Sequence, residues 1–319
     1  MSRRLLVTGA SGFIGHHVVS AALRKAEFPI RLIHHRRPPN LTAPAQVDIV
    51  HADLTRSDSL SGVCRDVDAV VHCASLIRGD AEALDRANAR GTEALVADAR
   101  RHGVRRIVYV STAAVYGRGP HRRSDVSALA LRPASATSRS RAAAEAHVLA
   151  AGGTVLRPHL VYGTGDRWVV PGLVALLRHL QAPVLCSSMH SAVDARTLAD
   201  VAVEAALSEQ DTAGAHHVNH PVPLSGSALV SLAQELLHMR GARSLTYDEA
   251  RERATGSPVA QHHLDMLSSD HWFLSDSIWD LLSLDPGQEP SRNLPQFLPW
   301  YRKLTDQDGD LSSSTGSSR

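Results

Sequence analysis

The sequence has few cysteines, almost no lysine and no long apolar run, and each shortage argues against a class of protein. Three cysteines, Cys64, Cys73 and Cys186, occur among 319 residues without a CxxC spacing, which argues against a disulfide framework and a structural zinc site. No run of about 18 apolar residues is present, so neither a membrane span nor a signal peptide is expected. We therefore expect a protein of the reducing cytoplasm.

The charge balance gives no reason to expect a charged macromolecular partner. The 34 basic and 32 acidic residues leave a formal net charge of +2, which favours neither nucleic acid nor a membrane surface. A small molecule is the expected partner. The histidines include His216, His217 and His220, which we interpret as a strand running into a loop; no metal site is predicted, because no zinc-type motif is present.

Short β-branched segments alternate with alanine-rich amphipathic segments through the first half of the chain, which is typical of βαβ units on a parallel sheet. Strands are expected at residues 4–9, 29–35, 47–53, 69–75, 106–112 and 153–158. Helices are expected at residues 14–26, 83–103 and 142–153, and later at 198–209 and 227–241. The predicted fold class is α/β, a doubly wound parallel sheet with its ligand at the carboxyl ends of the strands.

The rhythm of strands and helices breaks near Gly163, which predicts a second, smaller region. Residues 1–165 are expected to form a dinucleotide-binding domain, and residues 166–305 mainly a substrate-binding region with some segments returning to the first domain. Trp168, Met189 and Trp272 are expected to shape its pocket. Residues 306–319 are polar and serine-rich, so a disordered tail is predicted there.

A glycine-rich turn, TGASGFIG at residues 8–15, stands between the first predicted strand and the first predicted helix. Its glycines permit a tight turn and let the backbone approach a pyrophosphate at the amino end of the helix. The alternative is a turn that only packs the helix on the strand. The residues expected to hold the cofactor here are Gly9, Ser11, Gly12, Phe13, Ile14 and Gly15.

The end of the second predicted strand bears on which cofactor is used. An acidic side chain usually binds the 2′-hydroxyl of NADH there, but the chain has His35, Arg36 and Arg37 instead. Arginine binds a phosphate by charge-assisted hydrogen bonds, so NADPH is favoured, with NADH as the alternative if these arginines only face solvent.

Several motifs in order resemble the extended short-chain dehydrogenase/reductases, a family that includes nucleotide-sugar epimerases, dehydratases and ketone reductases. The motifs are TGASGFIG, HADL (51–54), HCAS (72–75), Asn88 followed by GT, STAAVYG (111–117) and LRPHLVYGTGD (156–166). The resemblance implies a Rossmann-like domain with a smaller carboxyl-terminal substrate-binding region, and a homodimer. It places Asp53 and Leu54 beside the adenine, Cys73, Ala74 and Ser75 along the cofactor, and Pro158 near the nicotinamide.

The family's catalytic pair is replaced in this chain. Members use a Ser or Thr, a Tyr, and a Lys four residues after the Tyr, because side chains four apart share one helical face. Thr112 matches the Ser or Thr. Thr137 stands in place of the Tyr and Arg141 in place of the Lys, and the only lysines are Lys25 and Lys303.

Three explanations remain open. An alkyl hydroxyl is a poor acid and a guanidinium keeps its proton, so neither Thr137 nor Arg141 is expected to protonate the carbonyl oxygen of a substrate. In the first explanation this proton comes from water or from a phenol of the substrate beside its ketone. Alternatively, Tyr116, Tyr162, His121 or Asp166 supplies it. In the third explanation the protein is no enzyme, but a sensor or regulatory module that binds NADP(H).

The favoured hypothesis is an NADPH-dependent ketoreductase in which Thr112, Thr137 and Arg141 act on the ketone. The bias toward arginine and alanine is typical of GC-rich genomes such as those of actinobacteria, whose specialised metabolism provides aromatic polyketide ketones for antibiotic biosynthesis. The silent sensor is the alternative. Nucleotide-sugar epimerase or dehydratase activity is the third interpretation; it is disfavoured because those reactions need a base where the Tyr is missing.

Overall fold

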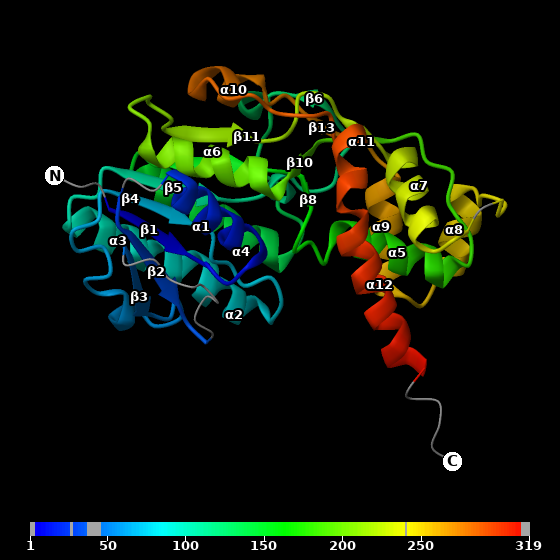
Figure 1. Ribbon diagram of the computed structural model, residues 1–319, viewed down its shortest axis with the longest axis horizontal. Coiled ribbons are helices and arrows are strands. Elements are labelled where there is room, and N and C mark those ends of the chain that lie inside the picture. Colours follow the sequence, from blue (N-terminus) through cyan, green and yellow to red (C-terminus); the bar gives the residue numbers. More distant parts are fainter. Residues whose placement is uncertain (1–3, 26–27, 37–45, 240, 314–319) are drawn as a thin grey trace, which may run out of the picture.

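The computed structural model describes residues 4–25, 28–36, 46–239 and 241–313, with side chains described as far as residue 306. Figure 1 shows a sheet with helices on its faces on one side of the molecule and a smaller, mostly helical region on the other. No described helix is both long and apolar enough to cross a lipid bilayer.

A seven-stranded parallel sheet forms the larger part. Its strands are β1 (Leu5–Thr8), β2 (Ile30–His34), β3 (Val47–His51), β4 (Ala69–His72), β5 (Arg106–Val110), β7 (Thr154–Arg157) and β11 (Gly214–His217). They lie in the order β11-β7-β5-β4-β1-β2-β3, and every neighbouring pair is parallel. The strand order reverses at β1 and β4, so the carboxyl ends of these two strands form the switch point where ligands bind in such sheets.

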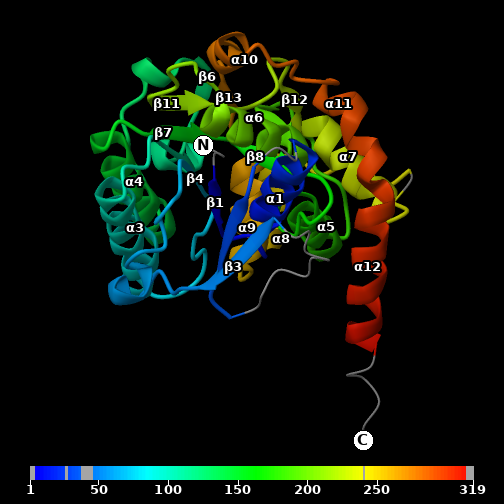
Figure 2. The same ribbon diagram turned by 60° about the vertical axis from the view of Figure 1, so that its left-hand side comes forward.

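Helices cover both faces of this sheet, as Figure 2 shows. Leu5 and Val7 of β1 enter a core with α1 (Phe13–Lys25), α6 (Ala195–Leu207) and α10 (Asp276–Leu282), whereas Leu6 enters the opposite core. The opposite core is completed by α3 (Gly91–Arg101) and α4 (Ala136–Ala150). The alternation of side chains along a buried strand thus supplies both cores. The predicted doubly wound α/β fold is confirmed.

The helix expected at residues 83–103 is broken by a π-helical turn. The segment begins as α2 (Ala81–Leu84), passes through the turn η2 (Asp85–Arg90) and continues as α3. Such turns are rare and are frequent at functional sites. This one places the side chain of Asn88 against the loop after β4.

The smaller region has its own core. Its helices are α5 (Val169–Leu180), α7 (Gly226–Leu236), α8 (Tyr247–Ala254), α9 (Pro258–Leu267), α11 (Pro290–Asn293) and α12 (Leu298–Ser313). Two small sheets join it to the larger part: β8 (Leu160–Tyr162) with β10 (Ala192–Asp194), and β12 (Leu224–Ser225), β9 (Met189–His190), β13 (His271–Phe273) and β6 (His121–Ser124) in that spatial order. Single turns of 3-10 helix are η1 (Ser57–Leu60), η3 (Ala113–Tyr116), η4 (Val126–Ala128) and η5 (Leu294–Phe297).

The two parts of the structure are not continuous stretches of the chain. The segments α6, β11 and α10 return to the large sheet, and β6 of the first half joins the small four-stranded sheet. The tail predicted from residue 306 is corrected in part, because α12 runs to Ser313 and extends away from the body in both ribbon views. Once a helix has formed, here in the segment that contains the buried Tyr301, it lengthens at little cost per added residue.

Candidate active site

The turn between β1 and α1 approaches neighbouring backbone too closely for any side chain. Gly9 has a φ of +71°, and a Cβ there would lie 2.7 Å from the amide nitrogen of Ala74. A Cβ on Gly15 would lie 2.0 Å from the carbonyl oxygen of Gly9. Glycine is therefore required at both positions, and the turn leads directly into the amino end of α1.

The first residues of α1 can bind a pyrophosphate. Ser11 and Gly12 are exposed, and Phe13 and Ile14 are half-buried where the helix begins. The first amides of a helix have no acceptor within the helix, and its dipole favours a negative group there. The turn thus fits the diphosphate of a dinucleotide, as the sequence predicts.

The segment after β4 faces the glycine turn. The amide of Ala74 donates to the Thr8 hydroxyl over 3.2 Å, and the Ser75 hydroxyl donates to the Asn88 side-chain oxygen over 3.2 Å. Burial raises the pKa of the Cys73 thiol to about 12, so the thiol is neutral near pH 7. Cys73, Ala74 and Ser75 thus follow β4 at the same end of the sheet as the glycine turn.

The end of β2 lies beside the segment after β3. His35 Nε2 is 3.1 Å from a carboxylate oxygen of Asp53, and Leu54 follows it, half-buried. The Arg36 side chain is exposed, whereas Arg37 lies outside the described residues. Asp53 is therefore in contact with the His35 imidazole, while the Arg36 side chain is exposed to solvent.

Thr112 and Pro158 meet at the carboxyl ends of β5 and β7. The amide of Ala113 donates to the Pro158 carbonyl over 2.8 Å. The Thr112 hydroxyl accepts from the amide of Ala114 at 3.2 Å, which caps the short helix η3. This bond uses a lone pair of the hydroxyl oxygen and leaves its hydrogen able to donate to a substrate oxygen.

The helix α4 carries Thr137 and Arg141 to the same edge. Ser135 caps this helix, so Thr137 lies in its first turn. The Thr137 hydroxyl lies 3.4 Å from the carbonyl oxygen of Ile77, in the loop after β4. Arg141 follows four residues later on the same face of the helix.

The Arg141 side chain runs inward rather than out to solvent. Its Nη2 donates to the carbonyl of Val110 over 2.7 Å, at the end of β5, and its Cζ lies 6.0 Å from the centre of the Tyr109 ring. Its Nε is buried without a hydrogen-bond partner among the described residues. Burial, and then the charge of Arg141, lower the pKa of His72 to about 3. Arg141 thus places a positive charge between β4 and β5.

Tyr116, one of the alternative proton donors, belongs to a buried polar network. Its hydroxyl accepts from Arg157 over 2.8 Å and is 2.8 Å from His217 Nε2. Arg157 also forms an ion pair of 2.6 Å with Glu145, which accepts from the Ser111 hydroxyl. The Tyr116 hydroxyl therefore connects η3 to the neighbouring strands β7 and β11.

The other three alternative donors are also engaged or buried. Tyr162 is buried, and burial raises the pKa of its phenol. Asp166 is fully buried, and its carboxylate accepts from the amides of residues 168–170 and from the Tyr301 hydroxyl. His121 lies within a cluster of rings in the small sheet. Among the described residues, the hydrogen-bond partner of the Thr137 hydroxyl is the Ile77 carbonyl and none of these side chains. Burial of this kind depends on the tertiary fold, so the sequence does not reveal it.

The helix α12 supports the loop that covers the glycine turn. The Tyr301 hydroxyl donates to the Asp166 carboxylate over 3.1 Å and accepts from the amide of Gly163 over 2.9 Å. In the same loop, a Cβ on Gly165 would lie 2.8 Å from the Phe13 ring. The loop is therefore held between the end of the glycine turn at Phe13 and α12.

Four histidines form a cluster between the large sheet and the small four-stranded sheet. His271 pairs with His121 and with His190 across adjacent strands, and the His159 ring stacks on His190 and His271 at centroid distances of 5.9 and 5.2 Å. A ring nitrogen of each of His121, His159 and His190 is buried without a partner among the described residues. No group of three or more His, Cys, Asp or Glu side chains in the described part of the chain is arranged to hold a metal ion.

This cluster makes the stability depend on pH. Burial first, and neighbouring imidazoles second, lower the pKa of His190 and of His271 from 6.5 to about 4. The unfolded chain therefore binds more protons between pH 6.5 and 4, so stability is complete above pH 6.5 and is lost as the pH falls toward 4. We expect the midpoint of thermal unfolding to fall by about 5 °C or more from pH 7.5 to pH 5.

The control for this prediction replaces one histidine at a time. His271→Phe removes one half-buried imidazole of the cluster and is expected to make the pH dependence shallower, whereas His16→Phe on the exposed face of α1 is expected to leave it as it is. Equal pH profiles for the wild type and His271→Phe would show that the histidine cluster does not cause the loss of stability at low pH.

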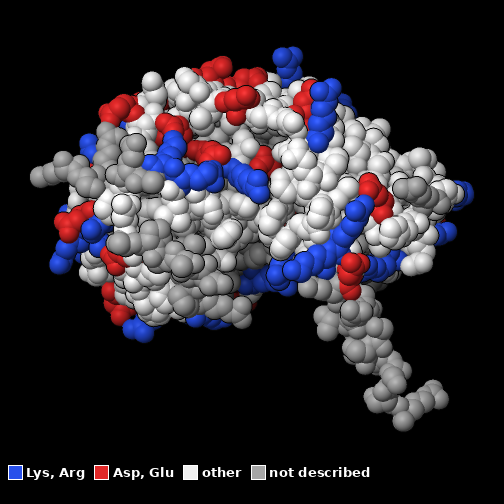
Figure 3. All heavy atoms as spheres, in the orientation of Figure 1, with Lys and Arg blue, Asp and Glu red and all other residues white. Residues whose placement is uncertain are grey.

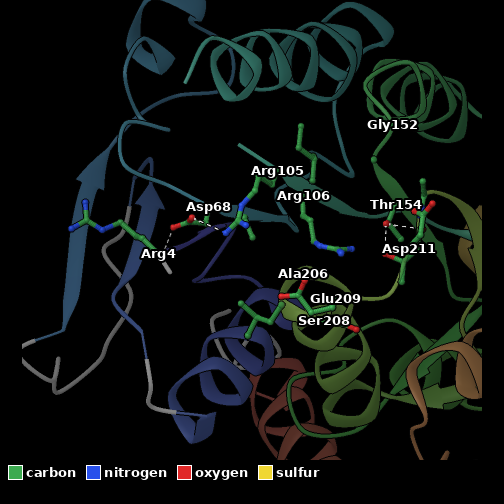
Figure 4. Close-up of a pocket in the computed structure, with 16 residues that line it drawn as sticks. Arg4, Asp68, Arg105, Arg106, Gly152, Thr154, Ala206, Ser208, Glu209 and Asp211 are labelled. Atoms are coloured by element: carbon green, nitrogen blue, oxygen red, sulfur yellow. Dashed lines mark hydrogen bonds and ion pairs between the residues drawn. The ribbon is translucent and has the colours of Figure 1, made fainter. Parts of the chain in front are cut away.

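A separate cavity of about 270 Å³ lies at the other edge of the sheet, as Figure 4 shows. It is lined by residues at the amino ends of β1, β4, β5 and β7, among them Asp68, Arg105 and Arg106, and by the end of α6 with the segment that follows it. Arg105 is 3.1 Å from Asp68, and Arg106 donates to the Gln210 carbonyl over 2.6 Å, so both cations are already bound. Because ligands of parallel sheets bind at the carboxyl ends, this cavity is not part of the active site.

Charges of both signs lie together on the outer surface over α1 and α6. Arg24 pairs with Asp200 over 2.5 Å, and Lys25 pairs with Glu204. Figure 3 shows basic and acidic side chains side by side over these helices. The ion pairs hold α1, and with it the glycine turn, against α6.

Comparison with known proteins matches most of the chain to a family. The model of the NAD dependent epimerase/dehydratase family matches residues 5–217. The 4-hydroxy-2-methyl-3-oxo-4-farnesyl-3,4-dihydroquinoline-1-oxide ketoreductase of Stigmatella aurantiaca is 31% identical over 185 residues, which are 55% of each chain. The 2-alkyl-3-oxoalkanoate reductase of Stenotrophomonas maltophilia is 30% identical over 189 residues, which are 55% of this chain and 56% of that protein. The chain thus matches little more than half the length of these relatives.

Solved structures resemble the chain over nearly its whole length. The UDP-glucuronic acid 4-epimerase of Bacillus cereus, in complex with NAD, has a TM-score of 0.74 at 18% identity, and the match covers 94% of this chain and 99% of that one. At this identity the likeness shows the shared fold alone.

Proposed function

This chain belongs to the NAD-dependent epimerase/dehydratase family, and we propose that it is an NADPH-dependent ketoreductase that works without the usual Tyr and Lys. Its substrate is an aromatic ketone with a phenol beside the carbonyl, of the kind found in polyketides of antibiotic biosynthesis such as angucyclinones. We propose further that it acts in the cytoplasm as a homodimer and takes no nucleic acid or membrane partner.

The observation that carries the proposal is the arrangement around Arg141. The glycine turn fits a dinucleotide, while the only side chains at the catalytic positions are two hydroxyls, Thr112 and Thr137, and one guanidinium. These groups can hydrogen-bond and stabilise a developing negative charge on oxygen, but they cannot release a proton near pH 7. These groups suit a ketone whose own phenol supplies the proton.

The chemistry divides between the substrate and the chain. A bound nicotinamide supplies a hydride to the carbonyl carbon. Thr112 and Thr137 orient the carbonyl oxygen, Arg141 lowers the energy of the negative charge that forms on it, and the neighbouring phenol of the substrate gives its proton to that oxygen. Water then returns a proton to the phenolate, so the products are the alcohol and the oxidised cofactor.

The test is single-turnover oxidation of NADPH, followed at the nicotinamide absorbance, with ketones of matched shape. We expect 8-hydroxy-1-tetralone, with its phenol beside the carbonyl, to be reduced at least about 100-fold faster than 1-tetralone, because general acid catalysis contributes that much. Equal rates for the two ketones would show that the phenol of the substrate does not supply the proton.

NADPH binding and an assay with a nucleotide sugar, added to this measurement, decide between the proposal and its alternatives. Tight NADPH binding without oxidation by any ketone would favour a silent NADP(H) sensor. Oxidation of a nucleotide sugar with return of the hydride to the same sugar would favour an epimerase, an activity present among proteins of this fold.

The preference for NADPH rests on the end of β2. Asp53 is already 3.1 Å from His35, and the exposed Arg36 side chain is free to reach a 2′-phosphate. We expect Arg36→Gln to raise KM for NADPH by about 10-fold, as loss of a hydrogen bond to a charged group predicts, and to change KM for NADH by less than about 2-fold. Arg65→Gln, another exposed arginine, is the control. An unchanged KM for NADPH would assign the preference to other groups.

A further inference from the structure

Three large apolar side chains stand in solvent beside the candidate active site. Leu76, Ile77 and Trp168 are 37, 45 and 44% exposed. The carbonyl of Ile77 lies 3.4 Å from the Thr137 hydroxyl, and Arg78, the next residue, lies over the Trp168 ring with its Cζ 4.5 Å from the ring centre. The aromatic side chain thus lies across the loop after β4 from the catalytic helix.

The backbone that carries Leu76 and Ile77 is held firmly. The buried side chain of Asn88 accepts from the Leu76 amide over 2.7 Å and donates to the Leu76 carbonyl over 2.8 Å. The side-chain nitrogen of Asn88 also donates to the Ser140 hydroxyl of α4 over 2.9 Å. The buried Asn88 side chain therefore holds the backbone that presents the exposed side chains of Leu76 and Ile77.

Trp168 is fixed in the same way from the other region. Its amide donates to the Asp166 carboxylate over 2.7 Å, and its carbonyl is 3.3 Å from His263 Nε2. Its ring is left in contact with Arg78, a residue of the first region. A ring and two aliphatic side chains held in place on both sides of a reaction site form a surface for a flat apolar molecule.

We propose that Leu76, Ile77 and Trp168 bind the aromatic ring system of the substrate, and that Arg78 covers the Trp168 ring until the substrate replaces it. This inference rests on the proposed function and specifies its substrate surface. Arg78 also complements the substrate in charge, because a phenol beside a carbonyl becomes negative when it gives up its proton. Displaced from the ring, the guanidinium stays at the rim of the site, where it can face that charge.

The first experiment measures binding without turnover, by equilibrium dialysis of 1-tetralone and of its saturated counterpart 1-decalone against the full chain with NADP⁺. We expect 1-tetralone to bind at least about 10-fold more tightly than 1-decalone, and Trp168→Ala to remove this difference. Trp168→Phe, which keeps a ring, is expected to retain most of it. The control is Leu185→Ala, which truncates another exposed apolar side chain.

Arg78 gives an effect of the opposite sign. Because the guanidinium competes for the ring, Arg78→Gln is expected to tighten binding of the uncharged 1-tetralone by about 2- to 5-fold, as the strength of an exposed cation–π contact predicts. Weaker binding in Arg78→Gln, or an unchanged preference for 1-tetralone in Trp168→Ala, would overturn the inference.

The two proposals fail separately. Preferential binding of 1-tetralone through Trp168 without reduction of any ketone would support this surface and overturn the ketoreductase. Reduction of 8-hydroxy-1-tetralone with the same KM in Trp168→Ala and the wild type would support the ketoreductase and overturn the surface.

Discussion

Replacing Arg141 by alanine is expected to lower kcat/KM for 8-hydroxy-1-tetralone by about 100-fold or more, the usual effect of removing a group that stabilises an oxyanion. Arg141 carries the positive charge at the carboxyl edge between β4 and β5, and its bond to the Val110 carbonyl holds it there. Steady-state kinetics, with NADPH affinity measured separately, would separate lost catalysis from lost cofactor binding.

A matched control is present on the same helix. Arg139 lies two residues earlier with its side chain exposed, so Arg139→Ala is expected to change kcat/KM by less than about 2-fold. Arg141→Lys keeps the charge and is expected to retain more activity than Arg141→Ala. If Arg141→Ala and Thr137→Val both turned over like the wild type, the roles assigned to these two residues would be wrong.

Replacing Glu145 by glutamine is expected to lower the free energy of unfolding by about 3 kcal/mol or more. Glu145 is fully buried and accepts three hydrogen bonds from Arg157 Nε and Nη2 and one from Ser111. The neutral amide would leave the buried guanidinium of Arg157 without its counter-charge. Thermal unfolding should show a midpoint lower by roughly 5 °C.

An exposed ion pair of similar length provides the control. Glu82 and Arg86 are 2.6 Å apart on one helical face, and both side chains are at least half exposed. Glu82→Gln is expected to cost less than about 0.5 kcal/mol, because solvent screens such pairs. Equal losses in Glu82→Gln and Glu145→Gln would mean that burial does not set the strength of the Glu145–Arg157 pair.

The parallel sheet could be predicted from the sequence because its strands are short, β-branched and separated by helices of regular period. The expected strands extended too far at their carboxyl ends, for example to residues 75 and 112, whereas β4 ends at His72 and β5 at Val110. The sheet ends where the chain turns outward to form the site. The apolar pattern does not mark this change, because the residues that follow are small or apolar as well.

The features missed at the site depend on residues distant in the sequence. Asn88 belongs to a sequence motif, but its hydrogen bonds to Leu76 require the π-helical turn, which no periodicity indicates. The contact of Arg78 with Trp168 joins two regions of the chain and gives no local signal. The histidine cluster likewise forms only when β6, β9 and β13 pair, and strands of two to four residues are too short to be predicted from alternation.

The bond between Tyr301 and the loop at residues 163–166 has a consequence for the order in which the protein becomes functional. The ribosome makes the glycine turn long before it reaches Tyr301, yet the loop that covers the turn takes its position from Tyr301. A nascent chain can thus form its parallel sheet early, as amino-terminal segments commonly do. Its nucleotide site reaches its final form only after residue 301 has been translated and α12 has docked.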